Sequence, residues 1–561
     1  MKKSKYIIAI DFGTTNCTVS YCSLNEDSSI LQFAIPQLVA QGLQGEELSL
    51  PSFVYLPLTS ELDSKIVALD WNQTKHHCVG KLARERGSTI PDHVISSSKS
   101  WLCHSGVDRK AKLLPLNHES VKAKMSPLEA SSKILEHIKE SWNYKMDQDP
   151  FEDQKLFITV PASFDPDARQ LVQEAAQMAG YPEITLLEEP QAAFYSWIYN
   201  QGEEWRKKLK VGDRILVVDI GGGTTDFSLI SVINNQGDLA LERVAVGSHL
   251  LLGGDNLDLT LAYFAKNKFE EEGHYIEDWQ FHALQFACRD AKEILLSDNP
   301  PESCDVTIMG RGSSLIGNSL TTTIHRKEIE LLILDGFFPK VNYDQCSLFE
   351  TQSGIQQIGL PFVKDPRVTS QLAKFLSMSG ISNINSVDKE RFIMPTAVLY
   401  NGGTMKAPAI RHRLLEVLNH WTKELNVAPV HLLEDENLDF AVSCGAAFYG
   451  LVREGKGVRI KSGTSRSYYI GVEDAVPAVP GLEAPMRAIC IVPFGMEEGD
   501  EKSIENKCFS LVLGEKAQFR FFSHATHSLS DGIIPEVGTV IKNWKKELSE
   551  LSPIETILDR E

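Results

Sequence analysis

The sequence predicts an α/β fold in which two duplicated lobes face each other across a ligand cleft, followed by a small β-rich unit. Residues 215–220 form an apolar, β-branched run typical of a buried strand, and residues 227–232 suit a returning strand. The turn between them holds three glycines. Residues 7–21 repeat this strand, Asp-x-Gly, Thr-Thr and strand pattern, with Asp11 and Asp219 lying 208 positions apart. Two similar hairpins at this spacing indicate duplicated lobes.

Both hairpins have the residues needed to hold the phosphates of a nucleotide. Glycine brings backbone N–H groups close to an anion, hydroxyls donate to phosphate oxygens, and carboxylates hold a hydrated Mg²⁺. A single hairpin could equally be an ordinary Gly-rich turn, but the second copy favours phosphate binding. We expect Asp11 and Asp219 to hold the metal through water. The expected phosphate cradle is Gly13, Thr14, Thr15, Asn16, Gly221, Gly222, Gly223 and Thr224.

Such an arrangement suits phosphoryl transfer, which depends mostly on positioning and charge neutralisation. The chain has no Walker-type Gly-x-x-x-x-Gly-Lys-Ser/Thr motif, and no Gly-x-Gly-x-x-Gly motif opens a helix. P-loop and Rossmann folds are therefore poor alternatives.

Length and composition are those of a globular protein with several domains: 561 residues, 42% hydrophobic and 23% charged. The net charge of −19 argues against nucleic acid or an anionic membrane as a partner. The short apolar run after the N-terminal lysines ends at Asp11, which is unlike a signal peptide. Ten scattered cysteines include no Cys-x-x-Cys pair, so we expect reduced thiols and a cytoplasmic location. Residues 76–78 and 103–104 could ligate a metal, but isolated residues are the commoner explanation.

The remaining signals of the first lobe follow in order. Residues 50–56 suggest a strand, and Ser126, Pro127 and Glu129 are typical of a helix start. A strand at 156–164 ends at a proline, and Asp165 caps a helix at 167–178. Lys99 lies in a polar segment, where a lone lysine is normally a solvated surface charge.

Three glycine- or glutamate-bearing turns are candidate parts of the site. A short strand at 184–187 leads to Glu189, which precedes a helix. A glutamate at this edge of an α/β sheet points towards a ligand, although it could instead be a helix-dipole partner. Gly402 and Gly403 lie between a strand and a helix at 409–420, where backbone can approach a flat ligand such as adenosine. Gly253 and Gly254 open another helical stretch.

The domain boundaries follow from composition. Residues 1–455 are expected to form the nucleotide-binding domain, with an irregular insertion at about 336–391. Residues 456–465 are rich in glycine, lysine and serine and are the expected linker. Residues 466–561 are expected to be β-rich, with strands near 468–472, 488–492 and 518–522 and a helix at 544–551.

Together these stretches resemble the 70-kDa heat-shock chaperone family, within the actin-like and sugar-kinase-like ATPase superfamily. The two phosphate motifs, Val160-Pro161-Ala162-Ser163-Phe164, Glu189-Pro190-Gln191, Gly402-Gly403-Thr404 and residues 439–447 match the motifs of the family in order, over roughly residues 5–455. The resemblance implies an actin-like fold and a slow ATPase that binds ATP or ADP with Mg²⁺. It also implies an unfolded polypeptide client and a co-chaperone or exchange factor as partners.

The resemblance also assigns residue roles. It implies that Lys99 positions the attacking water and the γ-phosphate, that Glu189 senses the nucleotide state, and that Pro161 and Arg169 form an allosteric switch. Lys292, Gly403, Lys406 and Asp439 fall at adenosine-contacting positions. The chain departs from the family where Lys406 replaces an arginine and Arg289 replaces a glutamate. Because lysine lacks the planar guanidinium fork, we expect weaker adenine binding.

Residues after the linker match the family less well. They make a smaller unit than the usual peptide-binding domain, so this unit is either divergent or a partial, truncated form of that domain. Two other functions stay open. A small-molecule kinase of the same superfamily would need a base beside the γ-phosphate and a substrate pocket. A nucleotide-binding scaffold without hydrolysis would show binding but no turnover, although Asp11, Lys99, Glu189 and Asp219 argue against lost hydrolysis.

Overall fold

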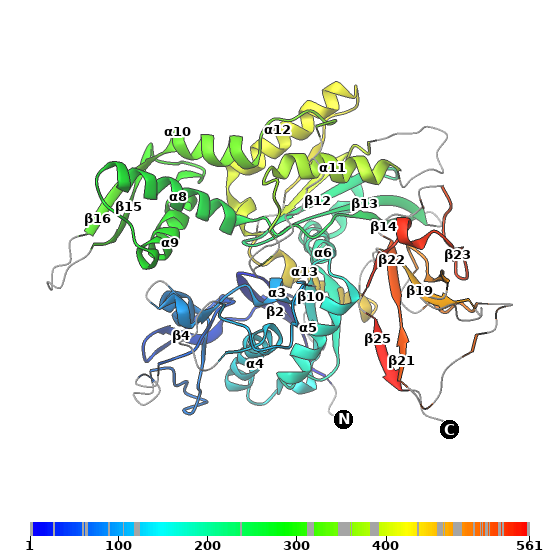
Figure 1. Cartoon of the computed structure of the whole chain (residues 1–561), viewed down its shortest axis with the longest axis horizontal. Helices are drawn as coiled ribbons and strands as arrows, with labels where there is room; N and C mark the ends of the chain where they lie inside the picture. Colours follow the sequence, from blue (N-terminus) through cyan, green and yellow to red (C-terminus); the bar gives the residue numbers. More distant parts are fainter. Residues whose placement is uncertain are drawn as a thin grey trace, which may run out of the picture.

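The computed structural model confirms the α/β fold class with two lobes and a β-rich C-terminal unit (Figure 1). It describes residues 4–557 apart from 26–28, 59–60, 62–65, 88–89, 105, 117–123, 236–237, 311–318, 346–359, 361, 382–391, 435–436, 457–463, 465, 475–484, 497–499, 505–506, 508, 511–513, 515, 525–528, 530–531 and 552. Most of the expected linker, 456–465, therefore lies outside the described residues.

The two lobes are built on sheets of the same local topology. In lobe I, the strand order is β11 (Ile184–Glu188), β10 (Lys155–Val160), β1 (Tyr6–Phe12), β2 (Asn16–Ser23) and β3 (Leu31–Gln32), and β6 (Ser49–Pro51) also pairs with β2. In lobe II, the order is β14 (Asp238–Val246), β13 (Thr225–Asn235), β12 (Arg214–Ile220), β17 (Ala397–Asn401) and β18 (His431–Leu433). Each hairpin strand, β1 or β12, pairs antiparallel with its return strand and parallel with a later strand.

Helices cover the lobes. Those of lobe I are α2 (Lys81–Gly87), α3 (Ser98–Leu102), α4 (Pro127–Lys145), α5 (Pro166–Met178) and α6 (Glu189–Gln201), followed by the short α7 (Trp205–Lys208). Those of lobe II are α8 (Gly254–Glu271), α9 (Asp278–Leu295), α10 (Arg326–Ile329), α11 (Val368–Ile381) and α12 (Pro408–Glu424). Within the described residues, none of the helices combines the length and apolarity that a membrane span requires.

Local capping explains where the main helices of lobe I begin. The Ser126 hydroxyl accepts from the Glu129 N–H at 3.0 Å, and the Glu129 carboxylate accepts from the Ser126 N–H at 2.8 Å. This reciprocal pair satisfies two N–H groups that have no partner within helix α4. Asp165 caps α5 in the same way, accepting from the Ala168 N–H at 2.8 Å.

A pair of helices lies between the two sheets, and the lobes share it. α6 and α13 (Ala441–Arg453) pack against each other, and apolar residues of β1 and of β12 bury against this pair. At the crossing of the two helices, a Cβ on Gly445 would stand 1.7 Å from the Ala192 carbonyl oxygen. Only glycine permits so close a backbone approach.

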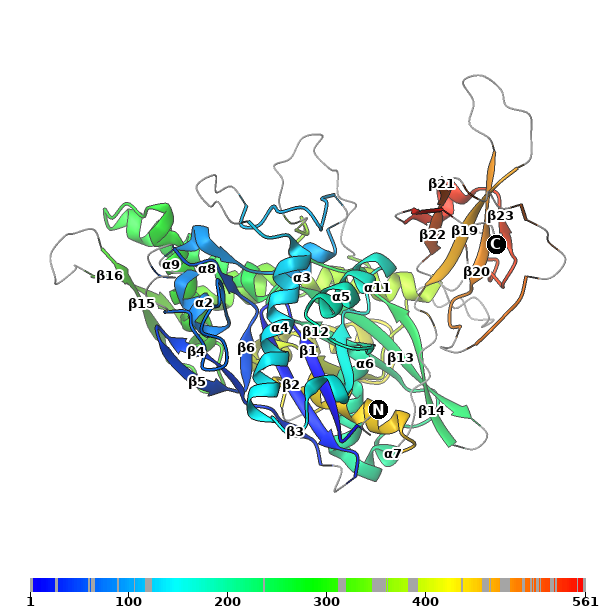
Figure 2. The same ribbon diagram turned by 90° about the horizontal axis from the view of Figure 1, so that it is seen from below.

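Two smaller β layers extend from the lobes. Lobe I carries β4 (Ile35–Ala40) with β5 (Leu43–Glu47), and β7 (Val54–Tyr55) between β8 (Cys78–Val79) and β9 (Val94–Ile95). Lobe II carries the hairpin of β15 (Ser303–Met309) and β16 (Ser319–His325), at the end of the molecule opposite the C-terminal unit (Figure 2).

The C-terminal unit is β-rich. One sheet has the order β23 (Val540–Ile541), β20 (Met486–Val492), β19 (Ser467–Glu473), β22 (Phe521–His524) and β24 (Ser549–Glu550). β21 (Lys516–Phe519) pairs with β25 (Ile554–Ile557), and α14 (Trp544–Glu547) buries Trp544 against the sheet.

Several expected elements differ in the structure. The stretch 50–56 is divided between β6 and β7, and 518–522 is interrupted at Arg520 because its two parts pair with different strands. The helix expected at 544–551 ends at Glu547. The expectation that 336–391 is irregular missed α11, whose Val368, Leu372 and Leu376 bury in the lobe II core.

We expect Gly445→Ala to destabilise the protein, because the new methyl group must push α13 away from α6. The free energy of unfolding should fall by about 1–3 kcal/mol in chemical denaturation. Gly336→Ala is the matched control, since a Cβ there would meet no atom within 4 Å. Equal stability of both variants would contradict the close helix contact.

Two buried histidines of lobe I make stability depend on pH. Burial lowers the pKa of both His77 and His137 to about 3, and the nearby Lys75 ammonium acts in the same direction. The unfolded chain binds these protons near pH 6.5, whereas the folded chain stays neutral. Their contribution is therefore complete above pH 6.5 and is lost as the pH falls towards 3.

We expect His77→Gln to reduce this acid sensitivity. Between pH 7 and pH 5, the variant should lose about 1–2 kcal/mol less of its unfolding free energy than the parent chain. Urea titrations at the two pH values measure the difference. His76→Gln, at the exposed neighbouring position, should behave like the parent chain, and a His77→Gln variant with the parent's pH dependence would refute the assignment.

Candidate functional site

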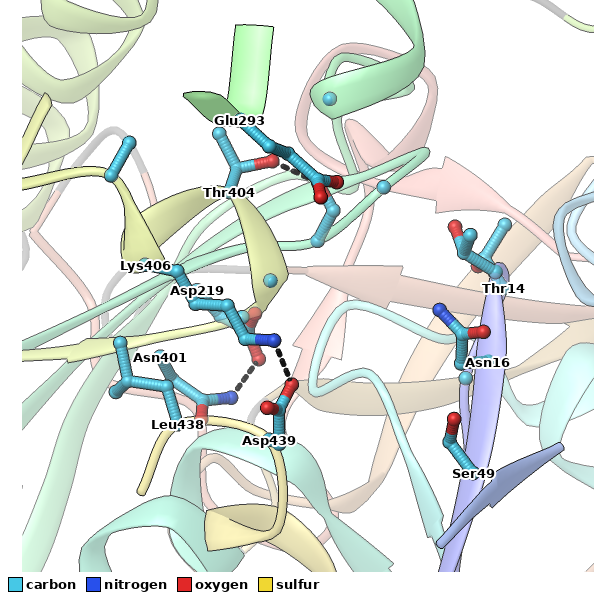
Figure 3. A pocket seen from close by; sticks show the side chains of 18 of the residues that line it. Thr14, Asn16, Ser49, Asp219, Glu293, Asn401, Thr404, Lys406, Leu438 and Asp439 are labelled. Carbon is cyan, nitrogen blue, oxygen red and sulfur yellow. Dashed lines mark hydrogen bonds and ion pairs between the residues drawn. The ribbon is translucent and has the colours of Figure 1, made fainter. Parts of the chain in front are cut away.

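The two glycine hairpins meet at a pocket of about 730 Å³ between the lobes. Figure 3 shows Thr14, Asn16 and Ser49 on the lobe I side, opposite Asp219, Asn401 and Lys406. The predicted site residues that line this pocket are Asp11, Gly13, Thr14, Thr15, Asn16, Lys99, Glu189, Asp219, Gly221, Gly222, Thr224, Gly254, Lys292, Gly402, Gly403, Lys406 and Asp439. Residues predicted from distant parts of the sequence thus surround one cavity.

The remaining predicted residues do not line the pocket. Gly223 and Gly253 lie directly behind its wall, where a Cβ would meet the Thr14 methyl group at 2.9 Å and the Gly222 carbonyl oxygen at 2.6 Å, respectively. Pro161 and Arg169 lie outside it: Pro161 directly follows β10, and Arg169 lies in the first turn of α5.

The hairpins approach each other so closely that Gly222 has no room for a side chain. A Cβ on Gly222 of lobe II would stand 1.9 Å from the Thr15 hydroxyl oxygen of lobe I. The turn of lobe I is supported from behind by Ser52, whose hydroxyl donates to the Gly13 carbonyl at 2.7 Å. The Thr15 hydroxyl itself is buried and has no hydrogen-bond partner among the described residues. A buried hydroxyl of this kind needs an acceptor such as a phosphate oxygen.

Acidic side chains gather at the closed end of the pocket. Burial, with the Glu189 charge, raises the pKa of Asp11 to about 7, and the same causes raise the pKa of Asp219 well above its usual value. The Asn401 amide donates to Asp219 at 2.6 Å, and the Thr159 hydroxyl donates to Asp11 at 3.0 Å. Each carboxylate is thus held in place by its own lobe.

Lys99 is buried and forms an ion pair with Glu189. Burial acts to lower the Lys99 pKa, but Glu189 and Asp11 outweigh it and raise that pKa. The sequence predicted that Glu189 precedes a helix. In the structure, Glu189 is instead the first residue of helix α6. Its position at the edge of the lobe I sheet directs its carboxylate into the pocket.

The acidic end fits a hydrated Mg²⁺. Asp11 and Asp219 supply hard oxygen donors from the two lobes, and because burial raises the pKa of both carboxyl groups, a bound cation would stabilise their charged forms. Among the described residues, no group of three or more His, Cys, Asp or Glu side chains is arranged to hold a metal.

Ion pairs line the other end of the pocket. Lys406 pairs with Asp439, as Figure 3 shows, and both side chains are about half exposed. Lys292 lies 2.5 Å from Asp258, and Arg289 lies 3.3 Å from Glu293 one helical turn away on α9. Arg84 of lobe I faces Arg289, and burial together with that charge lowers the Arg84 pKa. This end therefore offers alternating charges to a polar ligand.

Arg169 organises the loop that follows β10. Its guanidinium donates to the Phe164 carbonyl at 3.0 Å, to the Ala162 carbonyl at 3.2 Å and to the Glu188 carboxylate at 2.7 Å. Glu188 also pairs with Arg243 of lobe II. Arg169 and Pro161 thus border a contact between the lobes.

Sequence reasoning did not select several residues that line the pocket: Glu47, Leu48, Ser49, Arg84, Asp255, Asp258, Asn401, Thr404, Leu438 and Phe440. Asn401 could have been found, because it is the last residue of β17, at the sheet edge where ligands bind. Arg84 and Ser49 come from elements with no motif, so the sequence carries no signal for them.

Comparison with known proteins identifies the relatives of this chain. A family model described as Hsp70 protein matches residues 7–343. The chain is 34% identical over 217 residues to a chaperone protein HscA homolog of Acinetobacter baylyi, covering 37% of this chain and 33% of the relative. It is 26% identical over 446 residues to the HscA homolog of Rickettsia prowazekii, covering 80% and 57%.

A chaperone protein dnaK of Trieres chinensis is 27% identical over 280 residues, covering 47% of this chain and 39% of the relative. The chain thus spans less than two thirds of the length of the curated relatives it matches.

We expect Gly222→Ala to weaken the binding of MgADP at least tenfold, because its methyl group forces the two hairpins apart. Calorimetry measures the affinity. Thr15→Ala removes the opposing hydroxyl. When Gly222→Ala is added to the Thr15→Ala variant, it should therefore weaken MgADP binding by less than about threefold. Equal losses in both backgrounds would show that the hairpins do not need this contact.

Proposed function

The chain belongs to the Hsp70 protein family, and on this premise we propose that it is an ATP-dependent, chaperone-like protein whose nucleotide state drives closure of the two lobes. The observation that carries the proposal is the pocket in which both hairpins, Lys99 and Glu189 converge. Relatives named as HscA and dnaK chaperones support the chaperone function.

We assign ATP and ADP to this pocket with their phosphates between the hairpins. The N–H groups of the glycine turns and the hydroxyls of Thr14, Thr15 and Thr224 would bind phosphate oxygens. Bound Mg²⁺ would neutralise phosphate charge, and Asp11 and Asp219 would hold it through water. Lys292, Lys406 and Asp439, with the Gly402-Gly403 turn, would contact the adenosine.

Hydrolysis would be slow and would depend on the Lys99–Glu189 pair. The ammonium of Lys99 would position the attacking water and stabilise charge on the γ-phosphate, and Glu189, which pairs with Lys99, would sense the nucleotide state. Pro161 and Arg169 would transmit the state of the pocket, because the loop that Arg169 holds borders lobe II. Lobe closure would then report whether ATP or ADP is bound.

The proposed domains are 1–455 for nucleotide binding, 456–465 as a linker and 466–561 as a β-rich unit related to the peptide-binding domain. An unfolded polypeptide is the proposed client, and a co-chaperone or exchange factor is the proposed regulator. None of the described cysteines is in a disulfide bond, as expected in the cytoplasm, where we place the protein.

Single-turnover ATP hydrolysis with Mg²⁺, measured beside nucleotide affinity by calorimetry, tests the proposal. Tight binding with slow hydrolysis supports it. Binding without hydrolysis would instead identify a nucleotide-binding scaffold, and transfer of phosphate to a small molecule would identify a kinase. Absence of binding would refute the proposed site.

We expect Lys99→Ala to keep nucleotide affinity within about threefold and to lower the single-turnover rate by 10²-fold or more, on the order of the loss of a transition-state donor. Lys110→Ala is the control, because this surface lysine pairs with Glu174 far from the pocket. A rate unchanged in Lys99→Ala would refute the role assigned to Lys99.

A further inference from the structure

Three polar side chains form a contact between the lobes, beside the acidic end of the pocket. We call this the phosphate end, because the proposed function places the phosphates there. Ser163 belongs to the lobe I loop after β10, Asp226 to β13, and His249 to the segment between β14 and α8. The Ser163 hydroxyl lies 2.9 Å from Nδ1 of His249 and donates to Oδ1 of Asp226. His249 Nδ1 lies 3.5 Å from the same Asp226 oxygen. Both Ser163 contacts therefore cross from one lobe to the other.

This contact is shielded from water and carries charge. Ser163 is 7% exposed and Asp226 is 3% exposed. The Phe164 ring packs edge-on against the imidazole. The titratable groups that face His249 are Asp226 from β13, the Cys103 thiol from the end of α3, and Glu189 from α6. Burial opposes a charge on His249, but Asp226 outweighs it and raises the His249 pKa to about 10.

Two of these residues, Asp226 and His249, contact the elements that carry the reacting groups. Asp226 is the register partner of Asp219 across β12 and β13, so the two carboxylates share one face of the sheet. Cys103, which faces the imidazole, directly follows the helix that carries Lys99. A shift of His249 would therefore change the positions of both Lys99 and Asp219.

We propose that Ser163, Asp226 and His249 form a lobe junction that holds the phosphate end of the pocket closed, with His249 as a positioning residue for Lys99 and Asp219. This inference rests on the proposed ATP hydrolysis. The imidazolium offsets the charge of Asp226, which otherwise stands beside Asp219 and Glu189 and repels them. Deprotonation of His249 leaves Asp226 uncompensated and weakens closure, so hydrolysis should slow at alkaline pH.

The test uses the full chain with His249→Asn and Ser163→Ala, and His282→Asn as the control at an exposed position of α9. At pH 7.5, His249→Asn should lower the single-turnover rate about tenfold and leave MgADP affinity within about threefold. The parent rate should fall as the pH approaches 10, and His249→Asn should lack this alkaline decrease. His282→Asn should match the parent throughout.

Hydrogen exchange of the backbone amides of α3 and β13 with MgADP bound gives a second readout that does not depend on hydrolysis. It should be faster in His249→Asn and in Ser163→Ala than in the parent chain. If His249→Asn does not fold, Ser163→Ala decides, because it removes only the hydroxyl.

Unchanged rate, pH profile and exchange in the variants would overturn the junction. If the parent chain binds nucleotide without hydrolysing it, the proposed function fails. The exchange comparison then still supports the junction when the variants exchange faster, and overturns it when they do not.

Discussion

The structure depends on the contact between α6 and α13 at Gly445, because this helix pair lies between the two sheets. Ile7 of β1 and Ile215 of β12 both bury against it, so one apolar layer fixes the separation of the lobes. With that separation set, the glycine hairpins at the ends of β1 and β12 come into contact. A Cβ at Gly222 would meet the Thr15 side chain of the other lobe, and a Cβ at Gly445 would meet the backbone of α6, which explains why small residues are required so far apart in the chain.

The pocket concentrates negative charge that the protein alone does not neutralise. Burial raises the pKa of Asp11, Glu189 and Asp219, and Lys99 is a cation that faces Asp11 and Glu189. Such an arrangement destabilises the empty protein and favours a ligand that brings a cation with it. Cohesion between the lobes comes from elsewhere: Glu188 with Arg243, Ser163 with Asp226, and the apolar layer between the sheets. A ligand would therefore act on the charge of the pocket, whereas these other contacts hold the lobes together.

Much of the fold could be predicted because it is encoded locally. The strand patterns around Asp11 and Asp219, the serine cap before α4 and the aspartate cap before α5 are all signals within a few residues. Prediction failed where pairing partners decide the outcome. The single strand predicted at 518–522 is interrupted at Arg520 because the strands on its two sides pair with β25 and β19. α11 was missed because its apolar face can be recognised only from its packing against the lobe II core.

The sequence by itself determined the chemistry of the two hairpins: glycine turns, hydroxyls and carboxylates at matching positions, which predict phosphate and metal binding from local backbone geometry. Only the tertiary structure decided how closely these hairpins approach each other, that Lys99 pairs with Glu189 rather than with solvent, and that Ser163 meets His249. Those contacts join residues far apart in the sequence, between 86 and more than 200 positions. Their geometry follows from how the sheets pack on α6 and α13, so it cannot be predicted from a local sequence pattern.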